Sequence, residues 1–397
     1  MLNVRLVAVT IGAFSAVLIA ALSSAQTIIY RDDFNSPADA ANYNVFITAG
    51  ATGPSSDATF GYNYGAAPAS GGLGIPVAPH TTDGSTLGLR LRVDNLQSSV
   101  GTVVGAVEVA TKTLTLPSQY VMSADVWGNY IGSGTSIASS GVNGSTGAAM
   151  GVGTSGTSLQ YIAGNDGMLV ETFHDNGGGA NGQYRVYTDN TSPRPTPVNS
   201  PYYAAGTGAN SATYTDPYYS FLTSQSAPAA QSAFSATQGG STPAGIIGFA
   251  WHTMTITQDG TNLTWAIDGH TIATVPDSAL TFGGSQVSLG MDDSGLTGSS
   301  AANNQLFNAD IWDNLTITDL TTVPAFNAHI SLSFITRQPA ISFPAVYNHL
   351  YEVDYANSLV PPLQWNILAS NLIGSNTVIS INDTNRALQR FYRVKAQ

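Results

Sequence analysis

Cysteine is absent from the 397-residue sequence, and charged residues make up only 9% of it. Without cysteine no disulfide can form, and a lipid anchor attached through cysteine is excluded as well. Soluble domains usually contain roughly 25% charged residues. This scarcity of charge excludes long salt-bridged helices and coiled coils as the main architecture, so burial of apolar side chains must stabilise the protein.

Glutamate and lysine are scarce too. The sequence holds three Glu (Glu108, Glu171 and Glu352) and two Lys, against 21 Asp and ten Arg. Asp favours turns, caps and metal sites, whereas Glu favours helices and much glycosidase acid-base chemistry. The formal net charge of −12 argues against nucleic acid or an anionic membrane as a partner, because both select basic surfaces.

The N-terminus has the organisation of a secretory signal peptide. Arg5 precedes a mainly apolar run from Leu6 to Leu22, and Ser23-Ser24-Ala25 supplies small residues before Gln26. This pattern predicts cleavage after Ala25. The alternative is an uncleaved anchor, which needs about 20 apolar residues, and this run is shorter and interrupted by polar residues. We expect a secreted protein, extracellular or periplasmic, that is not inserted in a membrane after cleavage.

Short apolar or alternating segments recur from residue 27 onward, separated by clusters of Gly, Asn, Asp and Ser. Such spacing is typical of an antiparallel sandwich or barrel. The clearest pattern covers residues 251–275, where three alternating runs are separated by Asp259-Gly260 and Asp268-Gly269. Asp-Gly pairs favour tight hairpin turns, so this segment predicts a three-stranded meander.

The composition changes twice along the chain. Residues 188–245 are rich in Ser, Ala, Gly, Pro and Tyr and are too long for an ordinary connection. Near residue 324 a strand-rich stretch begins, which predicts a small β-sandwich of fibronectin III or immunoglobulin type, too small for an enzyme. The predicted organisation is a signal peptide at 1–25, a large β-domain at 26–324 with an insertion at about 188–245, and a C-terminal module at 325–397.

Three segments resemble the concanavalin A-like (laminin-G-like) jelly roll. Tyr30-Arg-Asp-Asp-Phe-Asn35 is similar to its opening strand, residues 251–269 to its meander, and Asp310-Ile-Trp-Asp-Asn-Leu-Thr-Ile317 to its closing strand. The whole chain resembles secreted bacterial proteins in which this jelly roll precedes a short β-sandwich module. The resemblance implies an all-β fold, but no single activity, because lectins, carbohydrate-binding modules, glucanases, lyases and adhesive domains share it.

Candidate catalytic residues are few. Jelly-roll glucanases of the common kind carry Glu-x-Asp-x-Glu on one strand, and the sequence lacks this string. The remaining Glu pair is Glu108 with Glu171, which would serve a glycosidase if the sheet brings the two carboxylates together. A lyase would instead use His174 with Tyr184 and Arg185. The alternatives are solvated strand carboxylates and a structural histidine, so enzymatic activity stays open.

Calcium is the one cofactor that the sequence suggests. Asp32 and Asp313 each alternate with apolar residues in the opening and closing strands, and a buried carboxylate must be hydrogen-bonded, paired or metal-bound. We expect a structural Ca²⁺ bound by Asp32 or Asp33 with Asp313 and Asn314. Hydrogen bonds to nearby backbone N–H groups are the alternative. The acidic pair Asp292-Asp293 is expected to be exposed, and no glycine-rich segment introduces a helix, so no organic cofactor is expected.

Sugar recognition needs flat aromatic faces and planar hydrogen-bonding groups. Nine residues in or beside polar loops are candidates: Tyr62, Tyr64, Trp127, Asn129, Tyr130, Tyr202, Tyr203, Tyr218 and Tyr219. The alternative is that they pack these loops onto the sheet. We expect a secreted, non-catalytic protein that binds an extracellular glycan or cell-surface component or acts as an adhesive. A carbohydrate-active hydrolase or lyase is the alternative function, and a matrix protein with no sugar site is the third.

Overall fold

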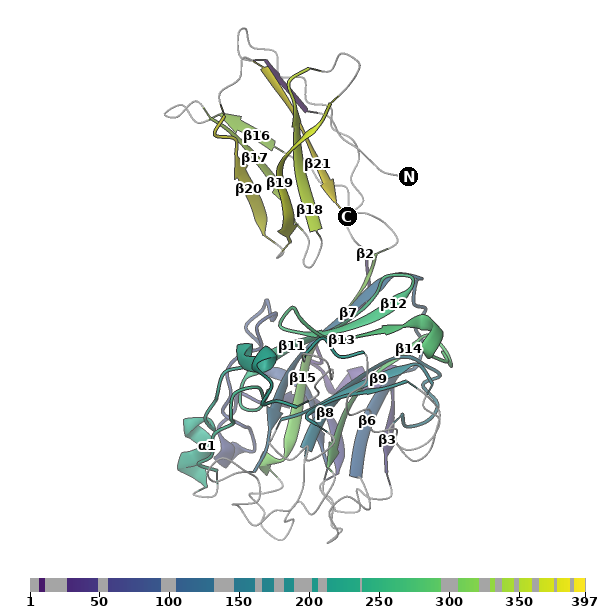
Figure 1. The fold of residues 1–397 in the computed structure, drawn as a ribbon. Coiled ribbons are helices and arrows are strands. Elements are labelled where there is room, and N and C mark those ends of the chain that lie inside the picture. Colours follow the sequence, from purple (N-terminus) through teal and green to yellow (C-terminus); the bar gives the residue numbers. More distant parts are fainter. Residues whose placement is uncertain are drawn as a thin grey trace. The chain divides into compact units, whose positions relative to one another are not determined.

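The computed structural model describes residues 7–10, 27–48, 56–93, 105–131, 146–160, 166–174, 182–188, 202–205, 213–235, 238–293, 306–320, 329–332, 338–345, 350–358, 364–374, 377–385 and 389–396. The chain forms two compact units, Ile28–Asp319 and a second unit that joins Met1–Thr27 to Leu320–Gln397. Both are built from strands (Figure 1). Among the described residues, every helix is too short or too polar to span a bilayer.

The first sheet of the larger unit has six antiparallel strands in the order β10-β9-β8-β14-β6-β3. The strands are β3 (Tyr43–Ile47), β6 (Gly105–Thr111), β8 (Thr146–Thr154), β9 (Met168–Phe173), β10 (Tyr184–Tyr187) and β14 (Gln286–Asp293). Strands β8, β9 and β10 follow one another in the chain, whereas their neighbours β14, β6 and β3 come from distant parts of the sequence.

The second sheet has eight strands, in the order β13-β12-β11-β7-β15-β5-β4, with β2 also paired to β15. The strands are β2 (Thr27–Asp32), β4 (Asp57–Asn63), β5 (Leu87–Arg92), β7 (Tyr120–Asn129), β11 (Trp251–Gln258), β12 (Asn262–Ile267), β13 (His270–Pro276) and β15 (Ala309–Asp319). The meander predicted for 251–275 is confirmed as β11, β12 and β13. Asp268 (φ 50°) and Gly269 (φ 77°) take left-handed conformations in its second turn.

One apolar core lies between the two sheets. Because side chains alternate along a strand, each strand points every second residue into this interlayer and the others to the outer face of its sheet. The interlayer holds Val107, Val109, Met150, Val170 and Leu289 from the six-stranded sheet and Met122, Ile256, Trp265, Trp312 and Ile317 from the eight-stranded one. The predicted jelly-roll sandwich is therefore confirmed.

In the part of the chain that the structure describes, five short helices connect the strands: η1 (Pro37–Asn42), η2 (Pro68–Ser70), η5 (Pro217–Phe221), α1 (Ala229–Phe234) and η6 (Asp277–Ala279). Helix η1 directly follows the opening strand. Its N-cap Ser36 accepts from the Ala38 N–H, and the Asp39 carboxylate accepts from the Ser36 N–H at 3.0 Å. This reciprocal capping fixes Asp39 beside the end of β2.

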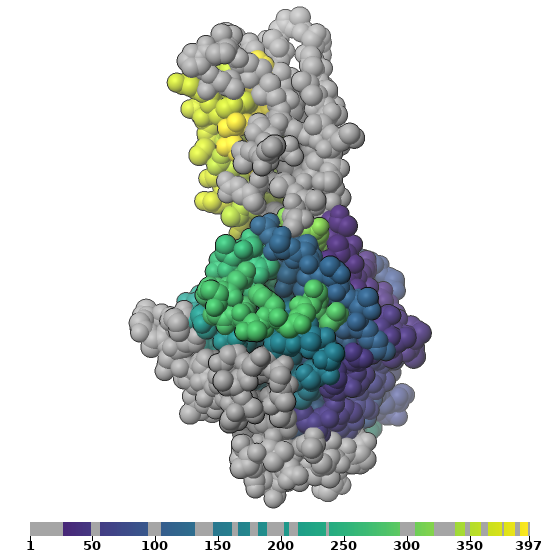
Figure 2. All heavy atoms as spheres, turned by 90° about the vertical axis from the view of Figure 1, so that its right-hand side faces the viewer, coloured from purple at the N-terminus to yellow at the C-terminus, as the bar shows by residue number. Residues whose placement is uncertain are grey.

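The described part of the 188–245 insertion packs on the eight-stranded sheet. The Ala204 N–H donates to the Ile272 carbonyl and the Thr274 N–H to the Tyr202 carbonyl, both at 2.9 Å, so residues 202–205 extend the sheet beyond β13. The Gln231 amide donates to Asn129 Oδ1 at 2.8 Å on the outer face of the sheet. Figure 2 shows the surface where the chain near residue 120 (blue) adjoins the hairpins of residues 260–280 (green).

A bulge in β15 changes the predicted alternation of the closing strand. The sequence places Ile311, Asp313, Leu315 and Ile317 on one face. In the structure the register shifts between Asp313 and Thr316, and Asn314 has φ 53°. Ile311 and Asp313 therefore face outward, whereas Leu315 and Ile317 lie in the interlayer. The bulge adds one residue to the strand, so the residues after it point to the opposite face from the one that regular alternation predicts.

The smaller unit is also a sandwich, of a four-stranded sheet β1-β21-β18-β19 and a three-stranded sheet β16-β17-β20. Its strands are β1 (Val7–Thr10), β16 (His329–Leu332), β17 (Pro339–Pro344), β18 (Leu350–Ala356), β19 (Asn366–Ile373), β20 (Val378–Asn382) and β21 (Gln389–Ala396). Phe343, Tyr351, Val353 and Tyr392 form its core. The small C-terminal β-sandwich is confirmed as a fold. Strand β1 belongs to the segment for which cleavage is predicted.

Candidate functional site

A buried polar group lies on the outer face of the six-stranded sheet. The Tyr187 hydroxyl donates to Glu171 Oε2 at 2.5 Å, and Arg185 Nη1 lies 3.7 Å from the same oxygen. The Arg185 guanidinium carbon lies 4.2 Å from the centre of the Phe173 ring. Burial opposes the charge of Arg185, but Glu171 and Tyr187 hold the pKa of this guanidinium above its usual value. Arg185 therefore stays charged and orients the Glu171 carboxylate.

Asp292 joins this group from β14, which is separated from β9 by β8. A Cβ placed on Gly147 would lie 2.8 Å from Asp292 Oδ1 and 3.2 Å from Glu171 Oε1. The two carboxylates therefore approach each other over Gly147 and are separated by no more than the sum of these distances. Asp292 and Asp293 are fully buried in β14, so the predicted exposure of this acidic pair is wrong. A regular strand, and not a turn, carries both residues.

Glu108 lies in the same row across the sheet but far from Glu171. The register pairs Glu108 with Gly290, Gly290 with Ala149, and Ala149 with Glu171. Three strand spacings place the two Glu backbones about 14 Å apart. The Glu108 carboxylate accepts from the Gln160 N–H at 2.9 Å, whereas Glu171 binds Tyr187. The structure does not bring these two candidate carboxylates together.

The candidate lyase residues lie on opposite faces of the six-stranded sheet. Tyr184 points into the interlayer, where its ring stacks on Tyr219 at 4.1 Å and its hydroxyl donates to the Gly245 carbonyl. His174 is fully buried there too, with Nδ1 3.2 Å from Asp310 Oδ1. Burial lowers the pKa of His174 to about 3, which leaves the imidazole neutral. Arg185 faces outward, so strand alternation separates it from both residues.

Most of the predicted sugar-binding residues are buried. Seven of the nine are less than 9% exposed: Tyr62, Tyr64, Trp127, Asn129, Tyr130, Tyr203 and Tyr219. Six of these side chains pack in two buried apolar clusters. The seventh, Asn129, accepts a hydrogen bond from the Trp127 ring and donates one to the Phe307 carbonyl. Tyr202 and Tyr218 alone keep accessible side chains, and both lie beside β13.

Tyr218 belongs to an accessible aromatic group, which we call the edge cluster and define as Tyr218, Phe221 and His270. Tyr218 is 38% exposed, and its hydroxyl donates to the Thr271 carbonyl at 2.6 Å. The Phe221 ring stacks on the His270 ring with centroids 3.9 Å apart and an interplanar angle of 7°. No sequence pattern predicts this contact, because residues of the insertion and of β13 meet only through the fold.

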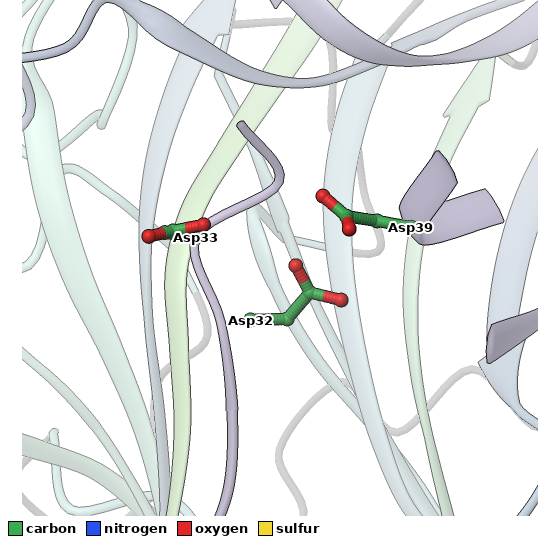
Figure 3. A group of neighbouring side chains, drawn as sticks. All are labelled: Asp32, Asp33 and Asp39. Carbon is green, nitrogen blue, oxygen red and sulfur yellow. The ribbon is translucent and has the colours of Figure 1, made fainter. Parts of the chain in front are cut away.

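Three carboxylates gather where β2 ends and η1 begins (Figure 3). Asp32, Asp33 and Asp39 can each place one oxygen so that all three lie within 4.8 Å of one another. Asp32 already accepts from the Phe34 N–H at 2.8 Å and from the Tyr43 hydroxyl at 3.0 Å. Burial raises the pKa of Asp32 to about 6, and the charges of Asp39 and Asp33 add to this rise. Hard oxygen donors of this kind suit Ca²⁺.

Asp313 and Asn314 lie outside this group of three and in a second polar cluster. Asp313 accepts from the Tyr64 hydroxyl at 3.0 Å and from the Asn314 N–H at 2.7 Å. The Asn314 amide donates to Asp125, which also accepts from His80 and Thr253. Burial raises the pKa of Asp313 to about 7, and the charges of Asp125 and Asp33 contribute. The sequence left two alternatives open for Asp313 and Asn314, a bound metal ion or hydrogen bonds. In the structure both side chains form hydrogen bonds.

Comparison with known proteins gives distant structural similarities only. No protein-family model and no curated protein matches the chain. A Bacillus subtilis protein of unknown function with a galectin-like fold is 10% identical, with a TM-score of 0.36 over 75% of this chain and 98% of that one. A Bacteroides ovatus glycoside hydrolase family 16 endo-glucanase is 12% identical, with a TM-score of 0.31 over 73% of this chain and 100% of that one.

The carbohydrate-binding module CBM66 from Bacillus subtilis is also similar, at 10% identity and a TM-score of 0.25, over 62% of this chain and 92% of that one. At such identities no residue's role is transferred to this chain. The assignment of function therefore depends on the arrangement of its own residues.

The ionisation of Glu108 gives a pH-dependent prediction. Burial raises the pKa of Glu108 to about 8, although hydrogen bonds from the Gln160 N–H and Ser288 oppose the rise. The unfolded chain has a Glu pKa of about 4.3, so folding takes up a proton and stability falls as the pH rises between these values. We expect Glu108→Gln to match the wild type in urea unfolding at pH 4 and to exceed it by about 4 kcal/mol at pH 8. An equal difference at both pH values would contradict this assignment, and Glu352→Gln in the smaller unit is the control.

Proposed function

We propose that the protein is a secreted, non-catalytic glycan-binding protein whose edge cluster takes the sugar. The observation that carries this proposal is the stack of the half-buried Phe221 on the exposed His270, beside the exposed Tyr218. Aromatic faces bind the C–H faces of sugar rings, and neighbouring polar groups orient the hydroxyls. The accessible cluster can meet a ligand from solvent, whereas the seven buried candidates pack against protein.

The partner that fits this surface is an extracellular or cell-surface glycan. The signal-peptide pattern supports export, and the net charge of −12 disfavours nucleic acid. Cleavage after Ala25 would remove β1 and leave β21 at the edge of its sheet. The smaller unit would then act as a spacer or interaction module.

Replacing Tyr218 tests the edge cluster. We expect Tyr218→Ala to weaken glycan binding about tenfold, which corresponds to about 1.4 kcal/mol, because the ring face is lost. Tyr218→Phe keeps the ring and loses only the hydrogen bond to Thr271, so it should retain most of the affinity. Glycan arrays would identify the ligand and titration calorimetry would measure Kd. Phe234→Ala, another exposed aromatic position, is the control for nonspecific loss.

An array on which the wild type binds no glycan would eliminate the glycan-binding proposal. The matrix protein without a sugar site would then be the better assignment. Equal weakening by Tyr218→Ala and Phe234→Ala would place the glycan site elsewhere on the surface.

A glycoside hydrolase is the second candidate, and one specific observation favours it. Glu171 and Asp292 bring two carboxylates together over Gly147 on the outer face of the six-stranded sheet. Retaining glycosidases hold their two carboxyl groups about 5–5.5 Å apart. Tyr187 and Arg185 would keep Glu171 ionised as the nucleophile, and Asp292 would then supply the general acid.

Hydrolysis is tested with any polysaccharide that the protein binds. If the second candidate is correct, the wild type releases reducing ends and Glu171→Gln lowers the rate by at least about a thousandfold. Glu108→Gln is the matched control, because Glu108 lies on the same face but three strand spacings away from Glu171. Binding without any release of reducing ends would reject the hydrolase.

We also propose that a structural Ca²⁺ is bound by Asp32, Asp33 and Asp39. The supporting observations are the three converging carboxylates and the raised pKa of Asp32, which a bound cation would reverse. Asp313 is left out, because it is not among the carboxylates whose oxygens lie within 4.8 Å of one another. The ion would attach the opening strand to η1.

Calcium removal has a defined expected effect. We expect EDTA to lower the Tm of the wild type by several degrees at pH 7 and added Ca²⁺ to restore it. Asp33→Asn should abolish the difference between EDTA and Ca²⁺, while Asp259→Asn in an exposed turn should preserve it. An unchanged Tm of the wild type in EDTA would exclude the calcium proposal.

A further inference from the structure

Four polar side chains enter the interlayer at the same end of the sandwich. Asp310 precedes Trp312 of the core by two residues in β15, and Asn308 precedes Asp310 by two. His174 extends β9, since its N–H donates to the Thr146 carbonyl at 3.1 Å. Asp293 follows the core residues Leu289 and Met291 in β14. Period-two alternation therefore directs Asp310, His174 and Asp293 between the two sheets. Asn308 directly precedes β15, and its amide lies 3.4 Å from Asp293 Oδ2.

The closest contact joins His174 to Asp310 across the interlayer. His174 Nδ1 lies 3.2 Å from Asp310 Oδ1, and both side chains are fully buried. Gly128, which pairs with Asp310 in the sheet, provides the space for the imidazole. A Cβ at position 128 would lie 2.4 Å from the His174 Cβ and 2.9 Å from Nδ1. Tyr130 stacks on the ring, with centroids 6.1 Å apart.

These residues leave an unusual number of buried polar atoms without a hydrogen bond. Both ring nitrogens of His174, both carboxylate oxygens of Asp310 and Asn308 Oδ1 have no partner. The Asn308 amide nitrogen is used, since it donates to the Val93 carbonyl at 3.0 Å. Each buried polar atom without a partner costs about 1–3 kcal/mol, and native proteins contain few of them. Such a concentration at one place indicates a missing ligand.

The unpartnered atoms are metal donors with a suitable spacing. Zn²⁺ binds imidazole nitrogen and carboxylate oxygen at about 2.1 Å, so two ligand atoms on one tetrahedral ion lie about 3.4 Å apart. The 3.2 Å separation of His174 Nδ1 and Asp310 Oδ1 is close to that value. An imidazole among oxygen donors favours a transition metal over Ca²⁺.

We propose that His174 and Asp310, with the side-chain oxygen of Asn308, bind a divalent transition-metal ion between the two sheets. This site is separate from the carboxylates of Asp32, Asp33 and Asp39, and it does not depend on glycan binding. The ion would link the end of β9 to the start of β15 and so join the two sheets directly. Because the ligands are buried, the ion would bind during folding.

Refolding with Zn²⁺ tests the proposal on the full chain. Protein unfolded in chelator is refolded with or without Zn²⁺, dialysed, and analysed by elemental mass spectrometry and thermal unfolding. We expect the wild type to retain about one Zn²⁺ per chain and to gain several degrees in Tm. Asp310→Asn preserves the shape of the side chain and should lower the retained Zn²⁺ at least tenfold. Asp33→Asn should retain the full amount.

A second histidine-carboxylate pair is the matched control. His252 Nδ1 lies 2.7 Å from Asp268 Oδ2, and the other Asp268 oxygen accepts from the Thr253 N–H. His252→Gln should therefore leave Zn²⁺ retention unchanged. Equal retention by the wild type and Asp310→Asn, or no retention by the wild type, would overturn the proposal and leave water as the ligand of these atoms.

Refolding with Co²⁺ keeps the proposal testable if Asp310→Asn does not fold. Cobalt bound to nitrogen and oxygen ligands gives visible absorption bands, which the wild type should show and which Zn²⁺ should displace. A wild type that folds with Co²⁺ but shows no such bands would also overturn the proposal.

Discussion

Burial between two sheets is the constraint on which the rest of the larger unit depends. The chain has no disulfide and few charges, so the interlayer of Val, Ile, Leu, Met and Trp side chains must supply most of the stability. Alternation then assigns every residue of each strand to the interlayer or to an outer face. This rule places Glu171 and His174 on opposite faces of the sheet, because they are three positions apart in one strand segment.

The sequence predicted the architecture well, because period-two patterns and Asp-Gly turns are local signals. The meander of β11 to β13 and the closing strand β15 lie where the patterns placed them. The bulge at Asn314 was not predictable, since no residue pattern distinguishes it from regular alternation, and it reversed the face of Leu315. The buried Asp292-Asp293 pair was missed for a related reason: two adjacent Asp residues have the composition of a turn, and only tertiary partners allow them in a strand.

The candidate sites were harder to predict than the fold. Sequence identified the aromatic residues of the polar loops but not their exposure, which depends on how the insertion packs. Phe221 and His270 form a stacked pair although the insertion and β13 are separated in the chain. Asp39 joins Asp32 and Asp33 through the cap of η1, a local pattern that the sequence does contain in Ser36 and Asp39. The capping box would therefore have been a usable signal for the third carboxylate.

The pairing of residues 202–205 with β13 has a consequence for solubility. An uncovered edge strand offers free N–H and C=O groups to other chains. Here the insertion supplies its own backbone to that edge through Tyr202 and Ala204. The insertion that carries two of the three edge-cluster residues thus also blocks strand addition between molecules, so shortening it would expose the sheet to aggregation.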